Sequence, residues 1–252
     1  MSETKLYKYL DAKGGLLMLY HKTLQFSNAT HLNDPFDCHP ALIDFTKVPA
    51  SKTQIWPAEL ITLVESNHYK EKRDKTYICS LTKRYNSIPM WAYYNNHQGI
   101  CIGLNMDKTR EYTPKMRGFI LGCLEWEVQY KDVIEKPNYF RDYNDYFRYQ
   151  ITTKSIEWKH EQEVRLISYD PSPDNKRIYG QQQGDSKDWI EIPVYLDIGG
   201  ECFDSVYLGL NIVDKDKNNI IKVARMCNPE IKIYQLTMDP NALRLKEELL
   251  EV

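Results

Sequence analysis

The sequence has no run of about 18 consecutive apolar residues, the length that a membrane-spanning helix requires. No long apolar segment follows the first residues, so we expect no signal peptide. The six cysteines are scattered without a Cys-x-x-Cys pair, which is typical of free thiols in a reducing compartment. These absences predict a cytoplasmic protein that does not contact a membrane.

Several motifs of well-known enzymes and binding proteins are also missing. The chain has no Gly-x-Gly-x-x-Gly loop, no Gly-x-x-x-x-Gly-Lys-Ser/Thr loop and no Gly-x-Ser-x-Gly. The histidines and cysteines lack the spacing of metal ligands, so we expect no bound metal. A formal net charge of −2 argues against a general binder of polyanions.

The composition fits a folded chain with a substantial core. Hydrophobic residues make up 42% and charged residues 27%, and there is no low-complexity stretch or internal repeat. This predicts one domain over residues 1–252. A polar region at 46–75 is the expected place for a lid or an insertion, and 170–188 is expected to be a mobile loop.

Short apolar or alternating segments, interrupted by single helices, predict the fold class. We expect an α+β domain with a mixed or mostly antiparallel sheet flanked by helices. The expected strands cover residues 6–10, 24–27, 77–81, 99–104, 128–130, 164–167, 190–194, 203–209 and 231–234. The expected helices cover 16–20, 57–69, 88–95, 139–158 and 215–227.

The most informative segment is an acidic doublet, Glu161-Gln162-Glu163, which leads into the strand-like run 164–167. Residues two apart on a strand point to the same side, so both carboxylates would face one cleft. Two like charges this close raise each other's pKa, which makes one a candidate for acid/base or cation-stabilising chemistry. The ordinary alternative is a pair of solvated charges at a helix-to-strand junction.

Three groups of residues together are similar to a known family. They are Leu6 to Tyr9 with Phe26-Ser27 and Asn33 to Asp37; Met90 to Tyr94 with His97, Gly99 and Cys101 to Gly103; and Trp158 with Glu161, Glu163 and Arg165. They resemble an uncharacterised prokaryotic family of unknown function, some members of which are linked to abortive-infection phage defence. The resemblance covers most of the first two thirds of the chain and implies no activity by itself.

The order of these motifs is also similar to that of ADP-ribosyltransferases of the toxin and antiphage type. Those enzymes carry Arg, His or Tyr on the first strand, a Ser/Thr-rich strand end followed by a helix, and Glu-x-Glu or Gln-x-Glu before a late strand. Here Tyr9 or Tyr7 lies on the first expected strand, and Ser80 precedes the expected helix at 88–95. Cys79 and Leu81 depart from a strict Ser-Thr-Ser motif. The resemblance implies an ADP-ribosyltransferase-like split sheet.

By this resemblance the substrate is NAD. Cleaving the bond between nicotinamide and ribose develops an oxocarbenium-like cation, which a fixed carboxylate stabilises more than the ground state. Glu163 would have that role, and Glu161 would activate or orient the accepting nucleophile. The acceptor would be a protein, a nucleic acid or water. The residues expected to bind NAD are Tyr7, Tyr9, Asn33, Asp34, Ser80 and Trp91.

Simpler interpretations exist for several of these residues. Asn33-Asp34-Pro35 is equally typical of a structural turn, and Trp91 with its aromatic neighbours is typical of a core. Two other functions also fit the sequence. One is a non-enzymatic ligand-sensing or interaction module of a defence system. The other is a nuclease in which Asp34, Asp37, Glu161 and Glu163 bind Mg²⁺.

Overall fold

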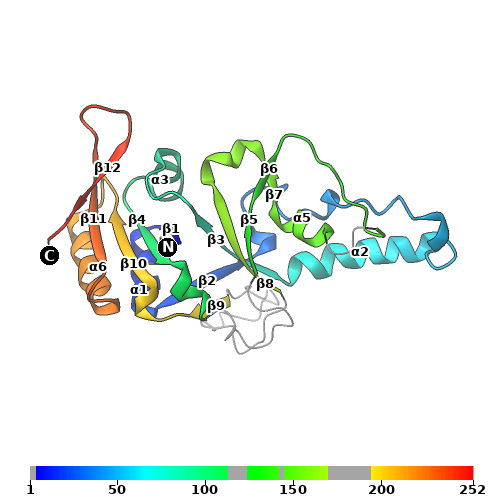
Figure 1. Ribbon diagram of the computed structural model, residues 1–252, viewed down its shortest axis with the longest axis horizontal. Helices are drawn as coiled ribbons and strands as arrows, with labels where there is room; N and C mark the ends of the chain where they lie inside the picture. The colour runs from blue at the N-terminus through cyan, green and yellow to red at the C-terminus, as the bar shows by residue number, and fades with distance from the viewer. Residues whose placement is uncertain (1–3, 113–123, 142–144, 170–193, 252) are drawn as a thin grey trace, which may run out of the picture.

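The computed structural model of the 252-residue chain describes residues 4–112, 124–141, 145–169 and 194–251. It is a mixed α+β structure built on one large, mostly antiparallel sheet, as the sequence predicts (Figure 1). None of its described helices is long and apolar enough to cross a membrane.

Ten strands form the large sheet. The order along it is β12-β11-β10-β4-β1-β3-β2-β9, and β8 pairs with both β3 and β5. Strands β10 and β11 run parallel, whereas β1 runs antiparallel to β3 and β4. The strands are β1 (Lys5–Leu10), β2 (Thr23–Asn28), β3 (Thr76–Thr82), β4 (Ile100–Asn105), β5 (Leu124–Glu127), β8 (Glu163–Tyr169), β9 (Val194–Asp197), β10 (Phe203–Leu208), β11 (Lys232–Met238) and β12 (Leu245–Leu249).

Helices and a small second sheet complete the described structure. Strands β6 (Gln129–Lys131) and β7 (Thr153–Ser155) form a parallel pair. The α-helices are α1 (Ala12–His21), α2 (Ala58–Asp74), α3 (Ile88–Asn95), α4 (Met106–Arg110), α5 (Tyr146–Thr152) and α6 (Asp214–Cys227). Short 3₁₀ helices are η1 (Ala29–His31), η2 (Pro40–Leu42), η3 (Ala50–Lys52), η5 (Ile156–Glu161) and η7 (Gly200–Cys202).

The sheet forks at β3. One edge of β3 pairs with β8 along its whole length. The other edge pairs with β1 at Thr82 and with β2 at Ile78 and Tyr77. Strands β1 and β2 then separate, because β1 continues alongside β4 and β2 alongside β9. Ser80 therefore lies on β3 between the positions where the two strands meet it.

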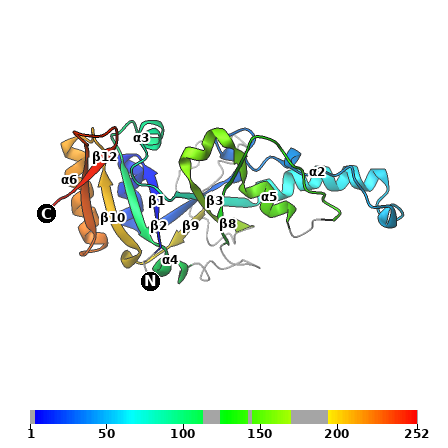
Figure 2. The same cartoon turned by 45° about the horizontal axis from the view of Figure 1, so that its top comes forward.

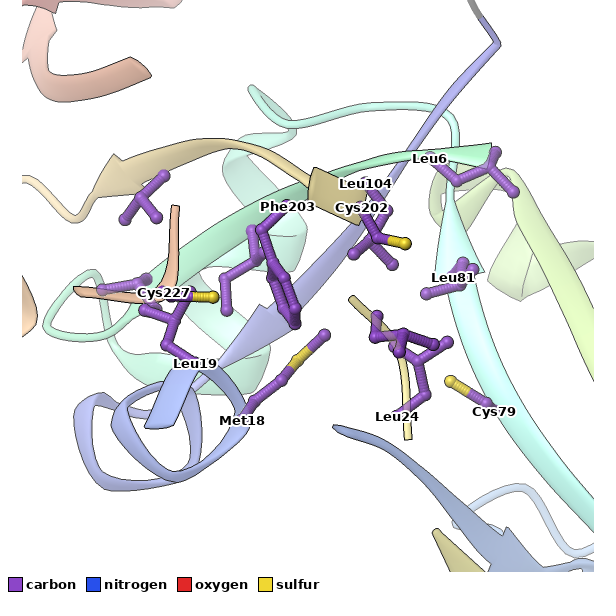
Figure 3. Packing of buried hydrophobic residues seen from close by; sticks show 14 of the residues in the cluster. Leu6, Met18, Leu19, Leu24, Cys79, Leu81, Leu104, Cys202, Phe203 and Cys227 are labelled. Atoms are coloured by element: carbon purple, nitrogen blue, oxygen red, sulfur yellow. The ribbon is translucent and has the colours of Figure 1, made fainter. Parts of the chain in front are cut away.

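The largest core cluster lies on one face of the sheet, under α1 and α6. Strand alternation places Leu6 of β1 in this cluster, and Figure 3 shows Leu6 at its edge, with Leu81, Leu104 and Phe203 of other strands also in the cluster. Helix α6 buries Ile220, Ala224 and Cys227, whose spacing is that of one helical face. In α1, a Cβ on Gly15 would come 2.3 Å from the side chain of Ile100, so glycine allows the helix to approach β4 closely.

The opposite face of the first strand carries Tyr9, which packs with α3. Tyr9 contacts the fully buried Trp91 ring edge-on, with the ring centroids 5.1 Å apart. Tyr207 of β10 belongs to the same cluster. Helix α3 therefore covers this face of the sheet beside the fork, while α2 lies at the far end of the molecule from α6 (Figures 1 and 2).

Most expected elements are present, with one clear error. The helix expected at 88–95 is α3, and the strands expected at 6–10, 24–27 and 77–81 are β1, β2 and β3. The long helix expected over 139–158 is wrong, since the chain instead forms α5, β7 and η5 in turn. The β-branched Thr153 favours the extended backbone that ends α5, and Ser155 caps η5 by accepting a hydrogen bond from the amide of Glu157.

Other expectations differ at their limits or lie outside the described residues. Helix α1 begins at Ala12, so Gly14 and Gly15 lie inside it and do not precede it. Strands β5, β7 and β12 were not expected. The region 46–75 contains η3 and α2, and its role as a lid stays a prediction. The loop expected at 170–188 and residues 190–193 of an expected strand lie outside the described ranges.

Candidate functional site

Arg165 of β8 is the centre of a buried network of charges. Its side chain is 0% exposed, and its two terminal nitrogens donate to the two carboxylate oxygens of Asp37 at 2.7 and 2.6 Å. Its Nε and one terminal nitrogen donate to Glu163 at 2.9 and 3.0 Å. The backbone carbonyl of Ile151 accepts a further bond of 2.6 Å. Such paired bonds fix both carboxylates in position.

Lys154 of β7 is the second cation of the network. Its Nζ lies 2.6 Å from Glu161, 3.4 Å from Glu163 and 3.9 Å from Asp37. The ammonium group also lies over the ring of Trp158, 4.7 Å from its centroid. Because Asp37, Glu161 and Glu163 face two cations, the network holds one more carboxylate than it has positive charges.

Neutral hydroxyl groups complete the surroundings of the doublet. The Tyr94 hydroxyl of α3 donates to one oxygen of Glu161 at 2.5 Å, and Lys154 occupies the other oxygen. The Glu163 amide donates to the Tyr130 hydroxyl at 2.8 Å, and the Thr82 hydroxyl donates to the Glu161 carbonyl at 2.5 Å. Tyr94 and Lys154 therefore hold the Glu161 side chain, and Tyr130 and Thr82 hold the backbone of the doublet.

The doublet is buried, which contradicts its interpretation as a pair of solvated charges. Glu161 is 3% exposed and Glu163 is 5% exposed. Burial alone would raise the pKa of Glu163, but the positive charges of Arg165 and Lys154 outweigh it and lower that pKa to about 2. The expectation that repulsion between the two carboxylates raises the pKa is therefore wrong for Glu163. Arg165 and Lys154 lie beside its carboxylate, and the sequence did not indicate these contacts.

The neighbouring groups respond to the same charges. Burial would lower the pKa of Lys154, but Glu163 and Glu161 raise it. Burial and the Glu161 carboxylate both raise the pKa of Tyr94. Lys154 therefore stays protonated and Tyr94 stays a neutral hydrogen-bond donor at neutral pH.

A cavity of about 310 Å³ opens beside this network, at the fork of the sheet. It brings together most of the residues that the sequence singled out. The expected site residues that line it are Tyr7, Tyr9, Asn33, Ser80, Glu161 and Glu163. They come from β1, the turn after η1, β3, η5 and β8, and Asp37, Tyr94 and Lys154 line the cavity with them.

Two expected residues lie elsewhere. Trp91 is fully buried in the core beneath α3, where its indole nitrogen donates to the Tyr85 carbonyl at 2.7 Å. Asp34 is 1% exposed, and one of its oxygens accepts a hydrogen bond of 2.9 Å from the amide of Phe36. This is the turn that the Asn-Asp-Pro sequence predicts, and it delivers Asp37 to Arg165.

Sequence reasoning did not identify Lys154 or Tyr94 as site residues. Lys154 fell inside an expected helix and has no motif around it, so no local signal marked it. Tyr94 belonged to a recognised motif, but its neighbours favoured a core assignment. One signal could have identified Tyr94. It lies three residues after the core residue Trp91 on the same helix, at the edge of the buried face, so its hydroxyl can reach Glu161 on another element.

The network is a poor site for a divalent metal ion. Among the residues that the structure describes, no group of three or more His, Cys, Asp and Glu side chains is arranged to hold one. Asp37 and Glu163 already share Arg165, and Lys154 lies among all three carboxylates. A hard cation would have to displace these ammonium and guanidinium groups.

Residues 90–166 match a family model described as a protein of unknown function (DUF2971). The matched segment runs from α3 into β8, so it contains Tyr94, Lys154, Glu161, Glu163 and Arg165. No curated protein and no solved structure matches the chain. The family match thus covers the part of the chain that supplies most of the network, and it assigns no activity.

Proposed function

We propose that the cavity binds NAD and that the protein cleaves the bond between nicotinamide and ribose, passing ADP-ribose to a macromolecule or to water. The observation that carries this proposal is the convergence of separate segments on one cavity. Tyr9 and Ser80 line the cavity together with Glu161 and Glu163. The order of these residues along the chain resembles the order of the motifs in ADP-ribosyltransferases. The resemblance to a family with members linked to abortive-infection phage defence adds to this proposal that the protein acts as an effector of phage defence.

The charges of the site suit this chemistry. The nicotinamide ring of NAD is positively charged, and the ribosyl group becomes cationic as the bond breaks. Glu163 is ionised at neutral pH because its pKa is about 2, and Arg165 holds both of its oxygens. A carboxylate fixed in advance stabilises the developing cation without reorganising at the moment of reaction.

Glu161 has different neighbours, which supports a different role. Its oxygens meet the Tyr94 hydroxyl and the Lys154 ammonium, and all three groups line the cavity. An acceptor nucleophile that replaced the Tyr94 hydroxyl would be hydrogen-bonded to Glu161. Glu161 would then orient the nucleophile and take its proton.

One observation favours the alternative of a ligand sensor without chemistry. Both carboxylates of the doublet are paired with cations, and a paired charge stabilises a second cation less than a free one. The nuclease alternative is disfavoured by the same pairing, because the carboxylates are not free to bind Mg²⁺. The sensor predicts NAD binding without turnover.

The test is the release of nicotinamide from NAD by the full chain. NAD labelled in the adenine moiety is incubated with the protein and a cell lysate, free nicotinamide is quantified by chromatography, and labelled macromolecules are separated by size. Nicotinamide release that depends on Glu163 supports the proposal. Calorimetric binding of NAD with no nicotinamide release supports the sensor, and cutting of nucleic acid that a chelator abolishes supports the nuclease.

A further inference from the structure

A second cavity of about 400 Å³ lies in the opening between β1 and β2, beneath the helix α1 that connects them. Both cavities have volumes within the range of sites for small ligands, roughly 300–1,000 Å³. Lys8 and Ser27 line this cavity and also the cavity beside the acidic doublet. The two cavities therefore meet at the fork of the sheet.

Lys8 is the charged residue at this junction. Its Nζ reaches across the fork and donates to the backbone carbonyl of Ser80 at 3.1 Å. Within the described part of the chain, no carboxylate forms an ion pair with Lys8. A half-buried ammonium group whose hydrogen-bond partner is a neutral carbonyl retains capacity for an anion.

The walls of the second cavity differ from those of the first. Leu10, Leu17 and Met18 provide apolar surface, and Thr23 and Gln25 of β2 provide polar groups. This mixture suits a flat heterocycle that carries hydrogen-bonding edges, such as adenine. The first cavity contains the excess of carboxylates, which suits the positively charged nicotinamide ring.

We infer that a dinucleotide spans the fork, with its adenylate half in the β1–β2 cavity, its diphosphate against Lys8 and its nicotinamide riboside half beside Glu163. This inference rests on the proposed function for the identity of the ligand and adds the location of the second half. In this arrangement Lys8 contacts the phosphates of both halves, and Gln25 contacts only the adenylate half.

The two halves can be tested separately by titrating the full chain with AMP and with nicotinamide mononucleotide in a calorimeter. Gln25 is exposed, so Gln25→Glu adds a negative charge at the adenylate cavity at little cost to folding. We expect Gln25→Glu to weaken AMP binding at least about fivefold, which is the lower range for one unfavourable charge contact. The affinity for nicotinamide mononucleotide should change by no more than about twofold. The matched control Asn241→Asp makes the same chemical change on the exposed β11–β12 connection.

The second pair of variants tests the junction. Lys8→Met keeps the length of the side chain but removes its charge, so it should weaken both AMP and nicotinamide mononucleotide at least about tenfold, the loss expected for one charge-assisted hydrogen bond. Lys8→Arg keeps the charge and should restore most of the affinity. Circular dichroism of each variant confirms that it is folded.

Three results would overturn the inference. They are AMP that fails to bind, AMP affinity that Gln25→Glu leaves unchanged, and a Lys8→Met variant that binds both halves as the parent does. Nicotinamide release from NAD, followed in the same samples, separates this inference from the proposed function. If AMP and nicotinamide mononucleotide bind as expected but NAD releases no nicotinamide, only the proposed activity is refuted. If nicotinamide is released and neither Gln25→Glu nor Lys8→Met changes the KM for NAD, only the spanning ligand is refuted.

Discussion

Arg165 and Asp37 lie 128 residues apart in the chain, and two parallel hydrogen bonds of 2.7 and 2.6 Å join their side chains. Asp37 is 1% exposed, and the turn built by Asp34 carries it to this position. Because Arg165 also holds Glu163, the contact ties the turn after η1 to the strand that carries the proposed cation-stabilising residue. The stability of the fold and the geometry of the site therefore depend on the same group.

We expect Asp37→Ala to lower the free energy of unfolding by about 3–5 kcal/mol, the cost of leaving one member of a buried ion pair without its partner. Urea unfolding followed by tryptophan fluorescence measures this. The control is Glu127→Ala, which removes an exposed pair with Lys83 and should cost no more than about 1 kcal/mol. Equal losses in the two variants would show that the buried network contributes no special stability.

The two carboxylates of the doublet are expected to differ in their effect on catalysis. Glu163→Gln removes the charge that faces the ribosyl cation, so nicotinamide release should fall by at least about two orders of magnitude. Glu161→Gln should spare nicotinamide release and reduce transfer to the acceptor, because its proposed role is with the nucleophile. Release and transfer are measured in the same reaction.

The matched control for the doublet is Glu157→Gln, an exposed carboxylate on the same 3₁₀ helix as Glu161. It should change neither rate. Because Glu163 is buried against Arg165, the activity of each variant is compared at a temperature where circular dichroism shows it fully folded. If both doublet variants keep the parent activity, the assignment of a transferase site is wrong.

The pH dependence of stability follows from Glu163. Its pKa is about 2 in the folded protein, below the value of about 4.3 for an unfolded chain. The stabilisation is therefore complete above about pH 5, and it is lost as the pH falls toward 2. Urea unfolding at several values between pH 7 and pH 3 measures the decline, and Glu163→Gln should flatten it. A parallel decline in this variant would assign the effect to other carboxylates.

Local patterns in the sequence predict much of the fold. The alternation in β1, the apolar run of β3 and the proline near the start of α3 each depend on neighbouring residues, so they were recognised from the sequence alone. Strand β12 was missed because its sequence Leu-Lys-Glu-Glu-Leu is mostly charged, and it is held by pairing with β11 at the edge of the sheet. Tertiary pairing decided its conformation against local preference.

The candidate site could be predicted only in part, for a related reason. Spacing predicted that Glu161 and Glu163 face one cavity, as they do, but it could not show which cations oppose them. Lys154 lies in a segment whose helical appearance was misleading, and it reaches the doublet because the chain turns into β7 at Thr153. Contacts between distant segments set the burial of the doublet and the pKa of Glu163, and these contacts leave no periodic signal in one sequence.

The ammonium group of Lys154 lies among all three carboxylates of the network. Lys154→Met keeps an apolar side chain against Trp158 but removes the charge that helps to lower the pKa of Glu163. The pKa of Glu163 should therefore rise, by about one unit if the loss is typical of one neighbouring opposite charge.

Since Glu163 must be ionised to act, the acidic limb of kcat/KM for nicotinamide release should move to higher pH in Lys154→Met. Lys154→Arg keeps the positive charge and should keep the parent profile, which separates the electrostatic effect from a loss of packing. The measurement is a profile of kcat/KM from about pH 2 to pH 7, because the acidic limb set by Glu163 lies below about pH 4, with circular dichroism confirming that the protein is folded at each pH. An acidic limb that stays in place in Lys154→Met would show that Lys154 does not control the ionisation of the proposed catalytic carboxylate, and that Arg165 and the other neighbours of Glu163 suffice to keep it charged.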